Sequence, residues 1–171
     1  MPMELIISQK PEIRLIGMSF YGDPFDIRGG WDAENEIGRV WTRFMKYFRL
    51  NEEGIQHIAA PGVFYEVHIY SDETATKGNF EVFVGVPVDH LEAIPVELLV
   101  KVLPPSAYAV FTVKGDEITS DWHLLIDQWM TEAGYRRAHP FTFQYYDDRF
   151  KGVDKISESI LDVYMPVEPF G

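Results

Sequence analysis

Apolar residues recur with a helical period in two stretches of the chain. In residues 37–48 they fall at i, i+3, i+4, i+7, i+8 and i+11, namely Ile37, Val40, Trp41, Phe44, Met45 and Phe48. The same offsets recur in Trp122, Leu125, Ile126, Trp129, Met130 and Ala133. Because this spacing gathers each set on one stripe of an α-helix, we predict amphipathic helices from Asp32 and Thr119 onward. Asp32 is a candidate N-cap, and Gly134 follows the second helix where a left-handed C-terminal residue is common.

Runs typical of β-strands surround both helices. One run precedes each helix and ends at a glycine (14–21 and 107–114), and two runs follow each helix (63–70 and 80–88; 141–146 and 160–167). Residues 98–102, which lie among prolines, add a short edge strand. The order strand, helix, strand, strand therefore occurs twice, which favours duplication of one unit, with chance similarity as the alternative.

We predict an α+β fold in which duplicated β-α-β-β units form one twisted antiparallel sheet with two helices on one face. The whole chain, residues 1–171, would be a single domain with related halves at about 1–90 and 91–171.

Alternation within the strands predicts which side chains face the helices. Val82, Val84, Val86 and Val88 alternate with mixed residues, so the valines should lie under the helices. The same rule assigns residues 63, 65, 67 and 69, residues 141, 143 and 145, and residues 161, 163, 165 and 167 to that core. The face away from the helices would then hold Phe64, Glu66, Phe83, Gly85, Gln144, Tyr146 and Tyr164. This aromatic surface with a few hydrogen-bonding groups is typical of a small-molecule pocket, and a second core or a dimer interface is the alternative.

Charge and composition restrict the partners. The chain has 15 basic and 27 acidic residues and a formal charge of −12, which argues against nucleic acid and anionic membranes because phosphate binding requires clustered Lys and Arg. It contains no cysteine, so disulfides and thiolate zinc sites are excluded. No leader or membrane-spanning pattern is present, and we expect a soluble cytoplasmic protein.

Catalytic motifs are missing from the sequence, including the nucleophile elbow, the phosphate-binding loop and the zinc-protease helix. The five histidines show no pair at helical ligand spacing, so we expect no metal site and no cofactor. His68 shares a strand face with Glu66 and makes an acid/base pair conceivable, although same-face neighbours are commonly only solvated. Trp41 and Trp129 lie on the helix stripes; at the core margin each is also a candidate to contact a ligand.

The last part of the chain resembles the closing signature of the GyrI-like small-molecule-binding family, which includes the effector-binding domain of several bacterial transcription activators. The resemblance lies in FQYYDDRF (143–150) and LDVYMPV (161–167), where family members show F-E-x-Y-D-x-R-F and a D-I-Y-I-P-I type strand. It extends upstream to residues 83–88, 94–95, 108–111, Gly115, the Trp129 helix and residues 134–135. It covers most of the chain.

The resemblance implies a duplicated fold with an aromatic cavity for hydrophobic, often cationic, small molecules. Gln144 stands where the activator domains have a cavity glutamate, and an amide cannot supply the negative charge. Glu66 or Glu81 would have to restore it. Tyr164 corresponds to the cavity tyrosine of the last strand, and Tyr146 to the tyrosine of F-E-x-Y. No helix-turn-helix module precedes Arg14, so the resemblance implies a stand-alone binding domain without direct DNA contact.

The sequence therefore predicts a protein that holds a hydrophobic or aromatic ligand, with a cation as one option, for drug sensing, sequestration or transcriptional regulation. Phe83, Tyr164 and Tyr108 would stack on the ligand, while Gln144 and Glu66 orient it. Two alternatives remain. One is a hydrolase of bulky reactive molecules with Glu66 as its acid, and the other is an interaction module for a protein such as DNA gyrase.

Overall fold

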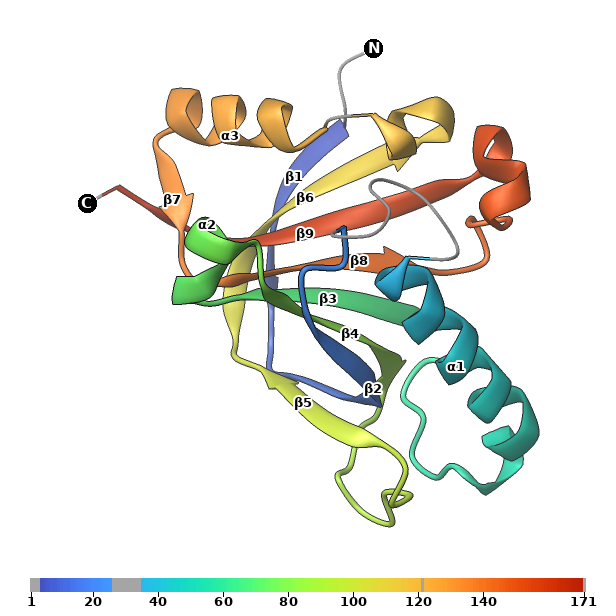
Figure 1. The fold of residues 1–171 in the computed structure, drawn as a ribbon. Helices are drawn as coiled ribbons and strands as arrows, with labels where there is room; N and C mark the ends of the chain where they lie inside the picture. Colours follow the sequence, from blue (N-terminus) through green and yellow to red (C-terminus); the bar gives the residue numbers. More distant parts are fainter. Residues whose placement is uncertain (1–3, 26–34, 121, 171) are drawn as a thin grey trace.

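The structure is a computed structural model that describes residues 4–25, 35–120 and 122–170. The helices are α1 (Glu36–Asn51), α2 (Asp72–Lys77) and α3 (Trp122–Ala133), with 3-10 turns at Glu52–Gly54, Gly115–Thr119 and Val153–Glu158 (Figure 1). The strands are β1 (Glu4–Lys10), β2 (Ile13–Gly22), β3 (Phe64–Tyr70), β4 (Phe80–Pro87), β5 (Leu99–Leu103), β6 (Ser106–Lys114), β7 (Tyr135–Arg137), β8 (Phe141–Tyr146) and β9 (Ile160–Pro169).

These strands form one sheet in the order β1-β6-β9-β8-β3-β4-β2-β5, with β7 added beside β9. Every ladder between them is antiparallel, and the direction of the strands turns steadily from β9 through β3 to β2 in Figure 1, as expected of a twisted sheet. The predicted α+β architecture is therefore confirmed. Its origin by duplication, and the division into halves at about residue 90, stay predictions.

The two long helices also agree with their sequence pattern. Asn35 caps α1, because its side chain accepts a hydrogen bond from the Gly38 amide over 3.0 Å; Asp32 lies outside the described residues. Gly134 follows α3 with a φ of +75°, the left-handed conformation expected there. None of the helices in the described parts of the chain is long and apolar enough to cross a membrane.

Short connections between distant strands make the sheet curl. Strands β1 and β6 form one end of the order, and β2 and β5 form the other. Nevertheless β1 joins β2 through residues 11–12, and β5 joins β6 through Pro104 and Pro105. Because each connection spans only about 11 Å even when extended, the two ends of the sheet must approach one another. Side chains on the concave face are therefore buried by other strands rather than by helices.

Both faces of the sheet are consequently buried. On one face, Phe44 of α1 packs near Val84 and Val86, and Ile126 of α3 packs near Val163. Trp41 and Phe64 contact both of these groups, so the two helices share a face, as predicted. The opposite, concave face holds a separate apolar core with residues from β2, β3, β4, β6 and β8, including Leu15, Tyr65, Val67, Phe83, Tyr108 and Phe143.

This second core corrects the predicted faces of β3 and β8. Glu66 lies directly opposite Val84 and Gln144 opposite Val163, and residues directly opposite in a ladder share a face. Phe64, Glu66, Gln144 and Tyr146 therefore point toward the helices, whereas residues 65, 67 and 143 point away. The prediction was wrong because β3 and β8 carry large apolar residues on both faces, so alternation alone does not identify the helix side.

A pair of glycines lies where β2 and β4 approach each other closely. Gly17 of β2 is directly opposite Gly85 of β4. A Cβ atom on Gly17 would overlap the carbonyl oxygen of Val84, and one on Gly85 would overlap that of Ile16. The two strands approach this closely because neither residue has a side chain.

We expect Gly17→Ala to lower the free energy of unfolding by about 2 kcal/mol, because the backbone must shift to admit the methyl group. Gly54→Ala is the matched control, since a Cβ there meets no atom within 4 Å. Urea unfolding of both variants makes the comparison. Equal stability of Gly17→Ala and the wild-type protein would show that the strands have room at this crossing.

Candidate functional site

A pocket of about 830 Å³ lies on the helix-bearing face of the sheet. It is lined by α1, by the beginning of α3 and the turn before it, by β3 and β8, and by the connection that follows β8. Its volume falls in the range of small-molecule sites, which is about 300–1,000 Å³. The floor consists of alternate residues of two neighbouring strands, namely Phe64, Glu66, His68, Gln144 and Tyr146.

Aromatic rings form much of the pocket wall. Trp41 of α1 meets Tyr146 edge to face with ring centroids 5.0 Å apart, and it lies 6.3 Å from Phe64. Phe150 also packs edge to face on Tyr146, with ring centroids 4.9 Å apart. Trp122, at the start of α3, is also part of the lining. Such rings offer large apolar contact area and electron-rich faces to a guest molecule.

A buried carboxylate lies among these rings. Glu66 is only 4% exposed. The indole Nε1 of Trp41 donates a hydrogen bond to Glu66 Oε1 over 2.6 Å, and the other oxygen, Oε2, lies 2.6 Å from His68 Nε2. A carboxylate in an apolar site needs such partners to offset its lost hydration. Glu66 and His68, which the sequence placed on one strand face and left as commonly solvated neighbours, are therefore in contact, and Trp41 is a further partner of Glu66.

Gln144 lies beside this carboxylate and bonds to a tyrosine. It is directly opposite Glu66 in the β3–β8 ladder, so both side chains emerge at the same level of the pocket floor. Tyr146 donates its hydroxyl hydrogen to Gln144 Oε1. Burial, with a further contribution from the Glu66 charge, raises the pKa of Tyr146 well above its usual value. The phenol consequently keeps the proton that it donates.

The connection after β8 is fixed by an arginine. Arg149 Nε lies 2.8 Å from Asp147 Oδ1, and its terminal nitrogen lies 2.8 Å from Asp162 Oδ2 on β9. This arginine, next to Phe150 in the chain, therefore joins the connection to β9. Asp147 lines the pocket but is engaged in this pairing.

Half of the predicted ligand-binding residues line this pocket: Trp41, Glu66, Gln144 and Tyr146. Phe83, Tyr108 and Tyr164 lie instead on the concave face, where Tyr164 stacks on Phe143 at 4.6 Å and Phe83 is fully buried. Trp129 packs against Phe111 and Tyr135, outside the pocket lining. These four were grouped with the pocket because the faces of β3 and β8 were inverted, and because Trp129 lies on a helix stripe.

Several lining residues were not predicted, Trp122 and Phe150 among them, and one candidate carboxylate lies elsewhere. Trp122 was assigned to the core from its stripe position, and Phe150 lies just beyond the last strand-like alternation. Its place in the closing motif was the available signal. Glu81 lies 2.9 Å from Lys101 in an ion pair and is not part of the lining. Glu66 is thus the buried carboxylate of this site.

Comparison with known proteins identifies the family. Residues 6–167 match the model of Cass2, the integron-associated effector binding protein, so the chain belongs to that family. It is also 28% identical over 168 residues to the transcriptional regulator BrlR of Pseudomonas aeruginosa. That match covers 96% of this chain but 56% of BrlR, so the chain spans little more than half of its relative.

Solved structures share the fold at low sequence identity. SAV2435, solved with bound tetraphenylphosphonium, matches with a TM-score of 0.70 and 18% identity over 97% of this chain and 94% of that one. The C-terminal domain of EcmrR matches with a TM-score of 0.65 and 14% identity over 99% of each chain. At such identities, the likeness establishes the fold alone.

Two buried tyrosines differ in how their hydroxyls are satisfied. Tyr146 donates to Gln144, whereas the hydroxyl of Tyr108, in the concave core, has no hydrogen-bond partner among the described residues. We expect Tyr146→Phe to lower the free energy of unfolding by about 1–3 kcal/mol, because it leaves the Gln144 oxygen buried without a donor. Tyr108→Phe should be neutral or raise it by about 1 kcal/mol. Urea unfolding near pH 7 compares the two variants. A larger loss of unfolding free energy in Tyr108→Phe than in Tyr146→Phe would contradict the assignment of the hydrogen-bonded hydroxyl to Tyr146.

Burial of Tyr108 also leads us to expect that the protein loses stability at alkaline pH. Burial raises the pKa of Tyr108 to about 12, while in the unfolded chain a tyrosine titrates near pH 10. Below about pH 10 both states keep the proton, and above it the unfolded state ionises first. The stability contributed by protonated Tyr108 is therefore lost between about pH 10 and about pH 12, at up to about 1.4 kcal/mol per pH unit. Between these pH values, the free energy of unfolding should fall less steeply with pH in Tyr108→Phe than in the wild-type protein. Urea unfolding curves measure it, and equal pH dependence of the two proteins would contradict this expectation.

Proposed function

We propose that the pocket binds a hydrophobic small molecule that carries a positive charge, and that Glu66 provides the opposing charge. The observation that carries this proposal is the position of a buried carboxylate in the pocket floor, surrounded by Trp41, Phe64 and Tyr146. A cation entering this site loses water but gains a close anion in a medium of low polarity, where the attraction is stronger than in water. The ring faces add cation–π and apolar contact.

The arrangement of Glu66 and Gln144 supports this assignment. In the activator domains that the chain resembles, the cavity glutamate occupies the position of Gln144. Here the amide stands at that position and the carboxylate stands directly opposite it on β3. We propose that Glu66 takes over the role of the cavity glutamate from the neighbouring strand, while Gln144 and Tyr146 orient polar groups of the ligand.

The relatives agree with this chemistry. The family is described as effector binding, SAV2435 was solved with a lipophilic cation, and BrlR is a transcriptional regulator. We propose that this chain belongs among the GyrI-like effector-binding proteins and acts in drug sensing, sequestration or transcriptional regulation in the cytoplasm. Its acidic composition disfavours direct contact with DNA.

The hydrolase alternative has one supporting observation. Glu66 and His68 are in contact at 2.6 Å inside the pocket, so a proton could be exchanged between them during turnover. If this alternative is right, Glu66→Gln abolishes hydrolysis of a bulky ester; turnover that survives the substitution removes Glu66 as the catalytic acid. An interaction with a protein partner is the other alternative, and a stoichiometric partner found with an empty pocket would favour it.

We expect Glu66→Gln to weaken tetraphenylphosphonium binding at least about tenfold, since the variant keeps the side-chain shape but loses the charge. Quenching of tryptophan fluorescence, with Trp41 in the pocket wall, measures the affinity. Glu81→Gln is the matched control, because it removes the same charge from a residue outside the pocket. Binding of neutral triphenylphosphine oxide should change little in either variant. Equal loss of tetraphenylphosphonium affinity in both would mean that net charge, and not the pocket carboxylate, attracts the cation.

A further inference from the structure

Two connections that are far apart in the sequence are held together beside the outer end of β4. One follows α1 and contains His57, and the other follows β4 and contains Asp89 and His90. The Asp89 amide donates to the His57 carbonyl over 3.0 Å, and the Ala59 amide donates to the Pro87 carbonyl over 2.9 Å. Arg14 of β2 donates to the Asp89 carbonyl over 2.9 Å. Backbone bonds therefore fix the spacing of these three side chains.

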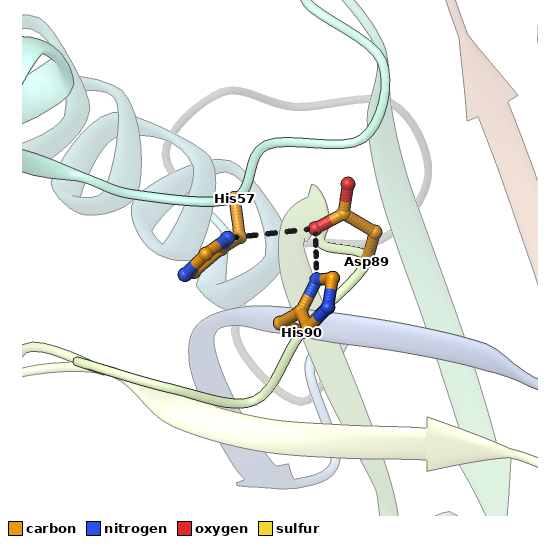
Figure 2. A group of neighbouring side chains, drawn as sticks. All are labelled: His57, Asp89 and His90. Atoms are coloured by element: carbon orange, nitrogen blue, oxygen red, sulfur yellow. Dashed lines mark hydrogen bonds and ion pairs between the residues drawn. The ribbon is translucent and has the colours of Figure 1, made fainter.

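The side chains of His57, Asp89 and His90 converge, as Figure 2 shows, with one carboxylate oxygen of Asp89 facing both imidazoles. Asp89 Oδ1 lies 3.7 Å from His57 Nδ1 and 2.8 Å from His90 Nδ1. One ligand atom from each of the three residues lies within 4.8 Å of the others. A tetrahedral ion with ligand bonds of about 2.0–2.1 Å requires donors about 3.3 Å apart, so the observed distances lie on either side of that value.

A fourth residue supports one of the histidines. Glu92 Oε2 lies 3.8 Å from His57 Nε2, the ring nitrogen that faces away from Asp89. Histidines that bind metals commonly present their second ring nitrogen to a carboxylate, which sets the tautomer and the ring orientation. His57 itself has a φ of +65°, a conformation that few residues other than glycine adopt. His57 holds this backbone conformation at a place where its imidazole lies near both Asp89 and Glu92.

We propose that His57, Asp89 and His90 bind a divalent transition-metal ion such as Zn²⁺, with Glu92 as a positioning residue for His57. Two imidazoles and one carboxylate, without a thiolate, are donors that suit Zn²⁺, Cu²⁺ or Ni²⁺ better than Mg²⁺ or Ca²⁺. Water would complete the coordination, because the cluster lies at the surface and Asp89 and His90 are exposed.

The bound ion would join the α1–β3 connection to the β4–β5 connection. The sequence did not predict this site, because residues 57 and 89–90 are brought together only by the β3–β4 pairing and the turn after β4. The proposal is independent of the ligand-binding pocket.

Titration calorimetry with ZnCl₂ on the full chain, without a histidine tag and after treatment with EDTA, tests the proposal. We expect one Zn²⁺ per chain, and an affinity that falls at least about tenfold in both His90→Ala and Asp89→Asn. His90 and Asp89 are exposed, so neither substitution disturbs the core. Glu92→Gln should weaken binding less than either, and the wild-type melting temperature should rise with Zn²⁺ concentration.

His139→Ala is the control, because His139 stacks on Phe141 at the beginning of β8 and belongs to no part of the cluster. It should bind Zn²⁺ as the wild-type chain does. A second measurement locates the ion: substoichiometric Cu²⁺ should broaden the imidazole proton signals of His57 and His90 before those of the other histidines. The proposal is overturned if His90→Ala and Asp89→Asn bind Zn²⁺ as tightly as the wild-type chain, or if Cu²⁺ broadens all histidine signals together.

Discussion

The curl of the sheet, imposed by the two short connections β1–β2 and β5–β6, determines where the site lies. Because the sheet closes over its concave face, that face becomes a core of aromatic and aliphatic side chains without any helix. The other face receives α1 and α3, which cover different groups of strands. Phe64, Glu66, Gln144 and Tyr146 form the pocket floor at the junction of these groups.

Polar groups within this floor are few and are paired with one another. Glu66 is held by Trp41 and His68, and Gln144 is held by Tyr146. This pairing matters because a carboxylate that is only 4% exposed loses most of its hydration, and these hydrogen bonds offset that loss.

Sequence patterns predicted the elements better than the site. Trp41 and Phe44 recur with a helical period and Val84 and Val86 with a strand period, so the helices and most strands could be located from the residues alone. The face of β3 that points toward the helices could not be predicted, because Phe64 and Tyr65 are both large and aromatic. Only the ladder register, in which Glu66 lies opposite Val84, identifies that face. Phe83 and Tyr164 were correctly placed on the face away from the helices, but Glu66 and Gln144 were wrongly grouped with them there. The His57, Asp89 and His90 cluster depends on long-range pairing, which no local pattern records.

The pairing of Glu66 with Gln144 bears on how relatives should be compared. Two residues that lie directly opposite each other in a ladder place their side chains at nearly the same point in space. An acid on one strand and an amide on the other can therefore be interchanged while the pocket keeps the same two polar groups. A comparison that follows position 144 alone would find an amide in this chain and would miss the carboxylate that lies directly opposite it on β3. The polar groups of such a pocket are therefore better compared as pairs across the ladder than as single positions.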